Sequence, residues 1–389
     1  MNVFAGLIGL VLIAVSLWDG FEAIVLPRRV SRRVRLTTIF YRTTWTSYSA
    51  LAKRLASTKR REKFLGVFGP LSLLMLLCVW ALCLIVGFAM TQWALGAKLN
   101  TPEGVATFGT YLYMSGVTFF TLGFGDVTPQ AALGRGLAVL EAGVGFGFLA
   151  IVIGYLPVVY GAFSRRETNI SLLDARAGSP PTAAELLRRH GQHQGMKELT
   201  DLLRDWERWS SELMESHLSY PVLSYYRSQH TNQSWLAAVT TILDTCALVM
   251  VGIDGSGPAW QAELTFAMTR HAVVDIAQIF NTSPHPCPKD RLMPDTLAVL
   301  RARLAEAGVP LREGAEAERK LTEIRKKYEP YVNALADYLL MPVPPWVLDA
   351  NTVDNWQSSA WEKRPTASLM GSTSPPSILP EAAKREHSW

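Results

Sequence analysis

The chain has 389 residues, of which 49% are hydrophobic and 18% charged, and its formal net charge is +5 at pH 7. This apolar content is high for a soluble protein of that length and indicates a membrane protein. Two of the four cysteines, Cys78 and Cys83, lie in an apolar stretch, while Cys246 and Cys287 come much later, so no disulfide framework is expected.

Three apolar stretches are long enough to form membrane-spanning helices, which need about 20 residues. They are residues 3–26, 64–96 and 137–163. The second is free of charge between Lys63 and Lys98. No Lys or Arg precedes the first stretch and no small-residue cleavage site follows it, so it differs from a signal peptide. We therefore expect residues 1–27 to form an N-terminal transmembrane helix of the mature protein.

The linker at residues 28–63 is strongly basic, with twelve Lys and Arg against the single acid Glu62. By the positive-inside rule it faces the cytoplasm, which places the N-terminus outside and everything after about residue 164 inside. Aromatic residues recur through 36–55, where we expect an amphipathic helix lying on the inner leaflet. Anionic lipids are candidate partners of this linker. Nucleic acid is the competing partner for so basic a segment, and we do not expect it, because the charge already serves as a topology signal.

The stretch at 97–133 is expected on the outer side and contains a short apolar segment, 105–120. It is too short to cross the bilayer and is predicted to be a re-entrant helix. It leads into Thr121-Leu122-Gly123-Phe124-Gly125-Asp126. Gly123 and Gly125 can adopt the positive φ angles that turn successive carbonyls the same way. An outer glycine turn without a transport role is the alternative interpretation.

Residues 111–129 read YLYMSGVTFFTLGFGDVTP and resemble the pore region of tetrameric potassium channels, whose filters are TVGYG loops. The segment is similar to that of the bacterial two-span-pore potassium channel family. Leu122 replaces the family's Val and Phe124 its Tyr. The resemblance covers about residues 64–166 and implies an all-α pore domain, 64–164. Its parts would be an outer helix at 64–96, a pore helix at 105–120, a filter at 121–126 and an inner helix at 133–163.

The resemblance also implies what the pore binds. Carbonyls of Thr121, Leu122, Gly123 and Phe124 would bind K⁺, with the Thr121 hydroxyl at the inner end and Gly125 completing the filter. K⁺ is expected as the permeant ion, and no other cofactor is expected. Because the chain has one filter and the ring needs four, we expect a homotetramer in the bilayer.

Several residues near the filter are candidates for its support. Thr118 precedes the filter, and Asp126 follows it where a carboxylate could hydrogen-bond behind the filter. The family often places tryptophans on the pore helix here, whereas this chain has Tyr111 and Tyr113. The hydrogen bonds around Asp126 therefore remain open.

Four further residues within the spans are the subject of hypotheses. Glu141 is expected to brace the filter by a hydrogen bond to the pore helix, with lining of the ion path as the alternative. Gly145 resembles the family's inner-helix glycine and is the preferred gating hinge, although tight helix packing explains it equally well. Asp19 and Glu22 are expected to pair with Arg28, Arg29 or another part of the basic linker.

Beyond 164 the sequence acquires helical periodicity and ordinary charge density, which predicts an all-helical cytoplasmic domain at 165–341. The expected helices are 183–190, 196–217, 235–251, 260–279, 295–307 and 315–340. Residues 235–253 are apolar enough to suggest a fourth span, but Asp244 in their middle favours a buried core helix. The Pro- and Ser-rich segment at 342–389 is predicted to be disordered.

Metal-site signals in this region are weak. His271 and Asp275 are spaced four residues apart on one predicted helix, where ion pairing is the preferred interpretation. His285 and Cys287 are a weaker pair still. A GxGxxG fingerprint and a regular Arg series in the spans are both lacking, which argues against a nucleotide-binding domain and a voltage sensor.

The sequence therefore predicts a potassium-selective channel subunit and not an enzyme, because residues 164–389 offer no nucleophile elbow, phosphate loop or paired-carboxylate signature. A nonselective cation channel is the first alternative, since Leu122 and Phe124 depart from the usual filter. A membrane-anchored sensor without transport is the second.

Overall fold

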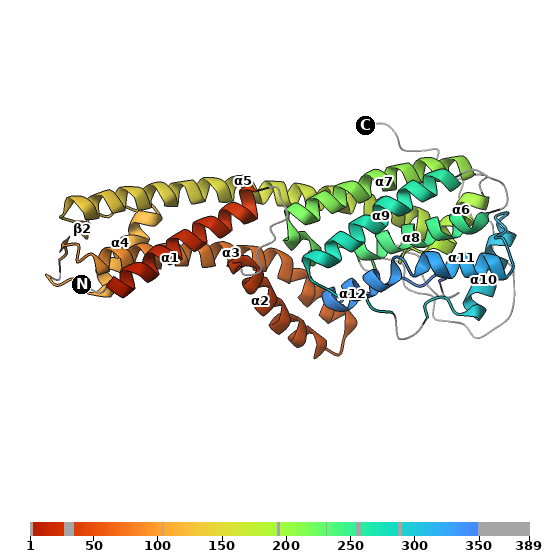
Figure 1. Cartoon of the computed structure of the whole chain (residues 1–389), viewed down its shortest axis with the longest axis horizontal. Coiled ribbons are helices and arrows are strands. Elements are labelled where there is room, and N and C mark those ends of the chain that lie inside the picture. Colours follow the sequence, from red (N-terminus) through yellow and green to blue (C-terminus); the bar gives the residue numbers. More distant parts are fainter. Residues whose placement is uncertain are drawn as a thin grey trace, which may run out of the picture.

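A computed structural model describes residues 3–26, 35–102, 104–192, 195–230, 232–253, 258–286 and 290–348. Arg28, Arg29, Cys287 and everything from residue 349 lie outside these ranges. The protein is an elongated all-α molecule, with long apolar helices at one end and a helical bundle at the other (Figure 1).

The apolar end is built from α1 (Val3–Gly20), α3 (Thr58–Ala94) and α5 (Ala132–Ala177). Each is long and apolar enough to cross a membrane, with α1 extended by a π-helical turn, η1 (Phe21–Val25). Small residues let α1 pack closely on α3, because a Cβ at Gly9 would lie 2.6 Å from the carbonyl oxygen of Gly87. The chain is therefore an all-α membrane protein in which the N-terminal helix packs beside α3.

Between α3 and α5 the chain forms one short helix, α4 (Phe108–Phe119), in the place predicted for a pore helix. Two-residue strands β1 (Leu99–Asn100) and β2 (Thr128–Pro129) pair antiparallel, with Leu99 opposite Pro129. This pairing joins the two ends of the loop that contains α4 and the filter segment.

The expected amphipathic helix is present as α2 (Leu36–Lys53). Its Trp45 is 3% exposed and packs in the core shared with the bundle, where Nε1 donates to the Tyr338 carbonyl at 3.0 Å. One face of α2 therefore packs against protein, a contact that the expectation of a helix on the inner leaflet did not include.

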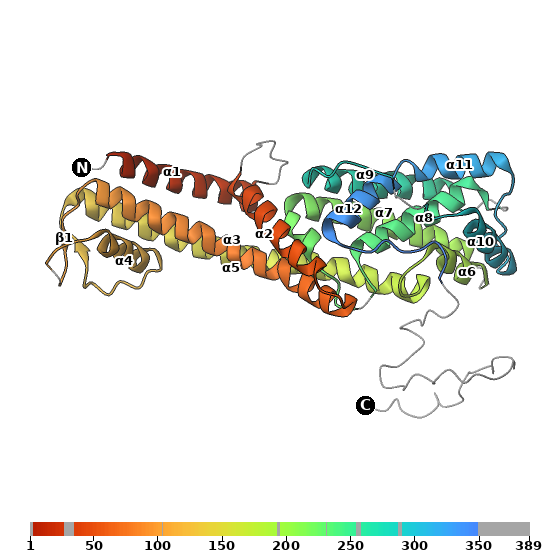
Figure 2. The same cartoon turned by 90° about the horizontal axis from the view of Figure 1, so that it is seen from below.

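The inner helix is longer than predicted. Its expected end at residue 163 is wrong, since α5 runs unbroken through Pro157 to Ala177 and spans about 70 Å. Ile170, Leu173 and Ala177 are buried in the bundle core, and this second apolar stripe explains why the helix continues. Figures 1 and 2 show α5 passing from the apolar end into the bundle.

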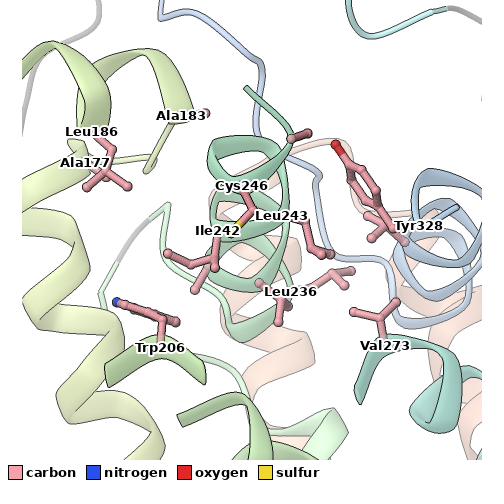
Figure 3. Packing of buried hydrophobic residues seen from close by; sticks show 14 of the residues in the cluster. Ala177, Ala183, Leu186, Trp206, Leu236, Ile242, Leu243, Cys246, Val273 and Tyr328 are labelled. Carbon is pink, nitrogen blue, oxygen red and sulfur yellow. The ribbon is translucent and has the colours of Figure 1, made fainter. Parts of the chain in front are cut away.

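The bundle surrounds a central apolar helix, α8 (Trp235–Gly252). Of its 18 residues 89% are buried, and Figure 3 shows Ile242, Leu243 and Cys246 facing neighbouring helices. The other elements are α6 (Ala183–Gln192), α7 (Met196–Ser219), the 3₁₀-helix η2 (Pro221–Tyr225), α9 (Ala259–Ile279), α10 (Pro294–Glu306), α11 (Ala315–Arg325) and α12 (Glu329–Leu339). The candidate fourth span is thus a core helix, and the buried Asp244 carboxylate pairs with Arg291 at 2.6 Å.

Two predicted boundaries in the bundle are wrong. The single helix expected at 315–340 is divided into α11 and α12, and Pro330, which lacks an N–H, lies in the first turn of the second helix. Residues 342–348, which were expected to belong to a disordered tail, pack on the bundle, where Trp346 is fully buried with the guanidinium of Arg291 5.5 Å from its ring centre; the rest of the predicted tail lies outside the described residues.

A candidate ion-conducting pore

Residues 121–126, the filter segment, directly follow the C-terminus of α4. Every second residue from Thr121 to Gly125 has a positive φ angle. Thr121, Gly123 and Gly125 have φ angles of 56°, 61° and 77°. The two glycines confirm the expectation from sequence. Thr121 extends the alternation to a residue with a Cβ, for which this conformation costs about 1–2 kcal/mol.

Two backbone hydrogen bonds connect the segment to α4. The Thr121 N–H donates to the Thr118 carbonyl at 3.0 Å, and the Leu122 N–H donates to the Val117 carbonyl at 2.8 Å. The filter thus starts directly at the carbonyl end of a helix, where the macrodipole is negative. Cations are favoured at such an end.

The predicted tyrosines have separate roles. The Tyr113 hydroxyl donates to Asp126 Oδ2 at 2.8 Å, so it links the pore helix to the residue after the filter. The Tyr111 hydroxyl instead donates to the Ala97 carbonyl at 2.7 Å. Only Tyr113 takes the place that the resemblance assigns to a pore-helix tryptophan.

Glu141 is fully buried at the junction of three helices. Its carboxyl group contacts the Ser115 hydroxyl of α4, and Gln92 Nε2 of α3 donates to it at 3.4 Å. The expected contact between Glu141 and the pore helix is therefore present.

The Ser115 hydroxyl also lies 2.7 Å from the Ile85 carbonyl oxygen of α3. A hydroxyl has one proton and a carbonyl can only accept, so Ser115 cannot donate to both neighbours. If Ser115 donates to the Ile85 carbonyl, its contact with Glu141 is a hydrogen bond only when Glu141 carries a proton and donates it to Ser115. The arrangement joins α3, α4 and α5 behind the filter.

Gly145 lies four residues further along α5, one helical turn, and is buried against the end of the pore helix. A Cβ at this position would lie 2.0 Å from the Phe119 carbonyl oxygen. The glycine therefore allows α5 to approach the backbone of α4 closely. This is tight helix packing, one of the two roles that the sequence allowed for Gly145, the other being a gating hinge.

Asp19 and Glu22 lie far from the filter, at the other end of α1. Arg35 Nε is 3.3 Å from Glu22 and 3.8 Å from Asp19, and Trp80 Nε1 of α3 donates to Asp19 at 2.9 Å. The acids thus pair with the basic linker as expected, through Arg35. They join α1 to the start of α2 and to α3.

Sequence reasoning missed Arg166 as a contact residue. Its buried guanidinium donates to the Leu223 carbonyl at 2.8 Å and to the Tyr226 carbonyl at 2.9 Å, and it pairs with Glu167. These bonds attach the pore-type helix α5 to the segment around η2. A lone basic pair after an apolar span resembles a topology signal, which is why the sequence did not separate Arg166 from Arg165.

The first weak metal signal is an ion pair, and the second is described only in part, because Cys287 lies outside the described residues. His271 Nε2 lies 3.7 Å from Asp275, and His285 Nε2 lies 3.4 Å from Asp337. Across the described ranges no group of three His, Cys, Asp or Glu side chains gathers as metal ligands would.

Comparison with known proteins supports an ion channel. Residues 74–160, which contain the filter segment, match the family described as "Ion channel". The chain is 22% identical over 251 residues to an uncharacterized membrane protein of Bacillus subtilis, YdjJ, covering 64% of this chain and 71% of that protein. It is 34% and 33% identical over 90 residues to Protein LctB of Bacillus caldotenax and of Geobacillus stearothermophilus, covering 66% of each. No solved structure matches the chain. The family match ends at residue 160 and leaves the bundle outside it.

Proposed function

We propose that the protein is a potassium-selective channel that conducts K⁺ passively as a homotetramer. The observation that carries this proposal is the alternating positive φ at Thr121, Gly123 and Gly125 directly after a short re-entrant helix. Four such segments around an axis would present rings of carbonyl oxygens, which replace the water shell of the ion.

The exposed surface of a single chain supports assembly. Leu122 and Phe124 of the filter segment are 56% and 66% exposed. In the most apolar 18-residue stretch of α5, only 11% of the residues are buried. Lipid can cover an apolar helix, but it cannot satisfy the backbone of an irregular segment at membrane depth. Neighbouring copies of the filter, with ions and water between them, provide the required polar surroundings.

The proposed orientation follows from charge. We place the N-terminus and the filter segment outside and the bundle in the cytoplasm, because the basic residues before α3 are cytoplasmic by the positive-inside rule. Cysteines introduced at Lys98 and at Arg60 test it, in a background that lacks the four native cysteines. An impermeant thiol reagent should label position 98 from outside intact cells and position 60 only after the cells are opened. Labelling of position 60 from outside would overturn the orientation.

Potassium flux and reversal potentials of the reconstituted full-length protein test the function. We expect wild-type vesicles to release K⁺ and to reverse near the K⁺ equilibrium potential in mixed K⁺ and Na⁺. Gly123→Ala should abolish selective conduction, since its φ of 61° is strained for any side chain although a Cβ would meet nothing within 4 Å. Gly116→Ala is the matched control, because this α4 glycine has equal space and an ordinary helical backbone.

The same recording separates the alternatives. A reversal potential near zero in mixed K⁺ and Na⁺ would indicate a nonselective cation channel, as the Leu122 and Phe124 substitutions allow. Absence of any flux from correctly inserted protein would favour a membrane-anchored sensor.

A further inference from the structure

A surface cavity of about 440 Å³ lies between α2 and α3. This volume is within the range of about 300–1,000 Å³ that is usual for ligand sites. One wall, from α2, carries the hydroxyls of Thr43, Thr44 and Ser47, and the apolar part is formed by Leu51, Leu71 and Met75. We call this cavity the α2–α3 groove.

The groove is suited to an apolar chain and not to a small charged solute. The three hydroxyls already donate to backbone carbonyls of α2, with Thr43 bonded to Ile39 at 2.8 Å and Thr44 to Phe40 at 2.6 Å. Ser47 donates likewise to Thr43 at 3.1 Å. Neither Lys nor Arg lines the groove, so nothing inside it would neutralise an anion.

The groove lies where the inner membrane boundary is expected. Twenty helical residues span about 30 Å, the thickness of the hydrocarbon core. Counted from Trp93 near the outer end of α3, they reach Leu73, which stands between the groove residues Leu71 and Met75. Leu71 and Met75 are 42% and 44% exposed, as expected for side chains that face lipid.

Basic residues gather next to the cytoplasmic end of the groove. The end of α2, the following turn and the start of α3, residues 53–63, contain six cations and one acid. The acid, Glu62, lies 3.5 Å from Arg227 of the bundle, whereas Lys59, Arg60 and Lys63 are exposed. Lys63 is about two turns, about 12 Å, from Leu71 along α3, so its flexible basic side chain lies on the headgroup side of the groove.

We propose that the α2–α3 groove binds an anionic phospholipid of the inner leaflet. An acyl chain lies against Leu51, Leu71 and Met75, and the phosphate lies near Lys59, Arg60 and Lys63. The charge complementarity selects an anionic over a zwitterionic lipid, since each Lys or Arg near an anionic headgroup favours binding by about fivefold. The proposal rests on the membrane location and orientation proposed above and not on ion conduction, so it can fail while the channel function stands.

Native mass spectrometry of the full-length protein tests it, with dioleoylphosphatidylglycerol or dioleoylphosphatidylcholine titrated into the detergent-solubilised protein. We expect tight phosphatidylglycerol adducts, favoured at least about fivefold over phosphatidylcholine. Ser47→Trp fills the groove and should remove them. Thr46→Trp is the matched control, because residue 46 is also exposed on α2 but does not line the groove.

A second variant separates the two parts of the site. Replacing Lys59, Arg60 and Lys63 with Gln should remove the preference for phosphatidylglycerol while leaving the groove intact. Equal retention of both lipids by the wild type would overturn the proposal, as would unchanged adducts on Ser47→Trp. Loss of subunit assembly in Ser47→Trp with lipid adducts retained would show that a second copy of the chain occupies the groove instead.

Discussion

Gly145 of α5 faces the Phe119 carbonyl of α4 so closely that a Cβ would lie 2.0 Å from the carbonyl oxygen. The close approach fixes the distance between the inner helix and the end of the pore helix, directly where the filter segment begins. Any enlargement at residue 145 must therefore displace one helix relative to the other.

We expect Gly145→Ala to destabilise the protein by about 1–3 kcal/mol, the usual effect of overpacking, and to disturb conduction. Gly136→Ala on the same helix should be nearly neutral, because nothing lies within 4 Å of its Cβ position. Unfolding midpoints in detergent and single-channel recordings measure the two effects. Wild-type stability of Gly145→Ala would show that α5 moves away easily, as a hinge would.

The buried Glu141 offers a test of the link behind the filter. Glu141→Leu should destabilise the protein by about 1–3 kcal/mol, because Gln92 and Ser115 lose a buried hydrogen-bonding partner. Glu141→Gln should be milder, since an amide can still donate to Ser115. Thermal stability and the potassium-to-sodium permeability ratio are the measurements. If both variants match the wild type, Glu141 does not brace the pore helix.

Arg166 is expected to couple the bundle to the pore-type helix. Arg166→Ala leaves the buried carbonyl of Leu223 and the part-buried carbonyl of Tyr226 without this donor, which should cost about 2–4 kcal/mol. It should also change open probability without changing selectivity. Arg165→Ala is the control, because the adjacent Arg165 is exposed. Equal open probability in both variants would contradict the coupling.

The buried His217 is expected to make the stability of the folded protein depend on pH. Burial, together with the charge of Arg166, lowers the pKa of His217 well below 6.5, and its Nε2 lies 3.3 Å from the guanidinium. Its other neighbours are the Leu213 carbonyl, Ser216 and the ring of Trp235. The folded protein therefore holds this imidazole neutral.

The unfolded chain binds a proton at His217 below pH 6.5, whereas the folded chain does not. Stability should thus be fully present above about pH 6.5 and fall as the pH decreases, by up to about 1.4 kcal/mol per unit. Unfolding midpoints between pH 7.5 and 5 in His217→Gln should show a shallower dependence than the wild type. A wild-type slope in His217→Gln would contradict the assignment to this residue.

Properties of contiguous residues were predictable from the sequence alone. Apolar runs predicted the positions of α1, α3 and α5, and the glycines at 123 and 125 predicted the positive φ angles there. Both depend on hydrophobicity and local backbone sterics, which a short window contains. The helix ends were less accurate, because α5 continues where packing against the bundle, and not membrane thickness, sustains it.

Only the tertiary structure decided which distant residues meet. Glu141 meets Ser115 and Gln92 across 26 and 49 residues of chain, and Arg166 meets Leu223 across 57. The sequence could propose that Glu141 needs a partner, because a buried carboxyl group must be satisfied, but not which side chain supplies it. That choice depends on how helices cross and on where a missing Cβ, as at Gly145, allows backbones to approach.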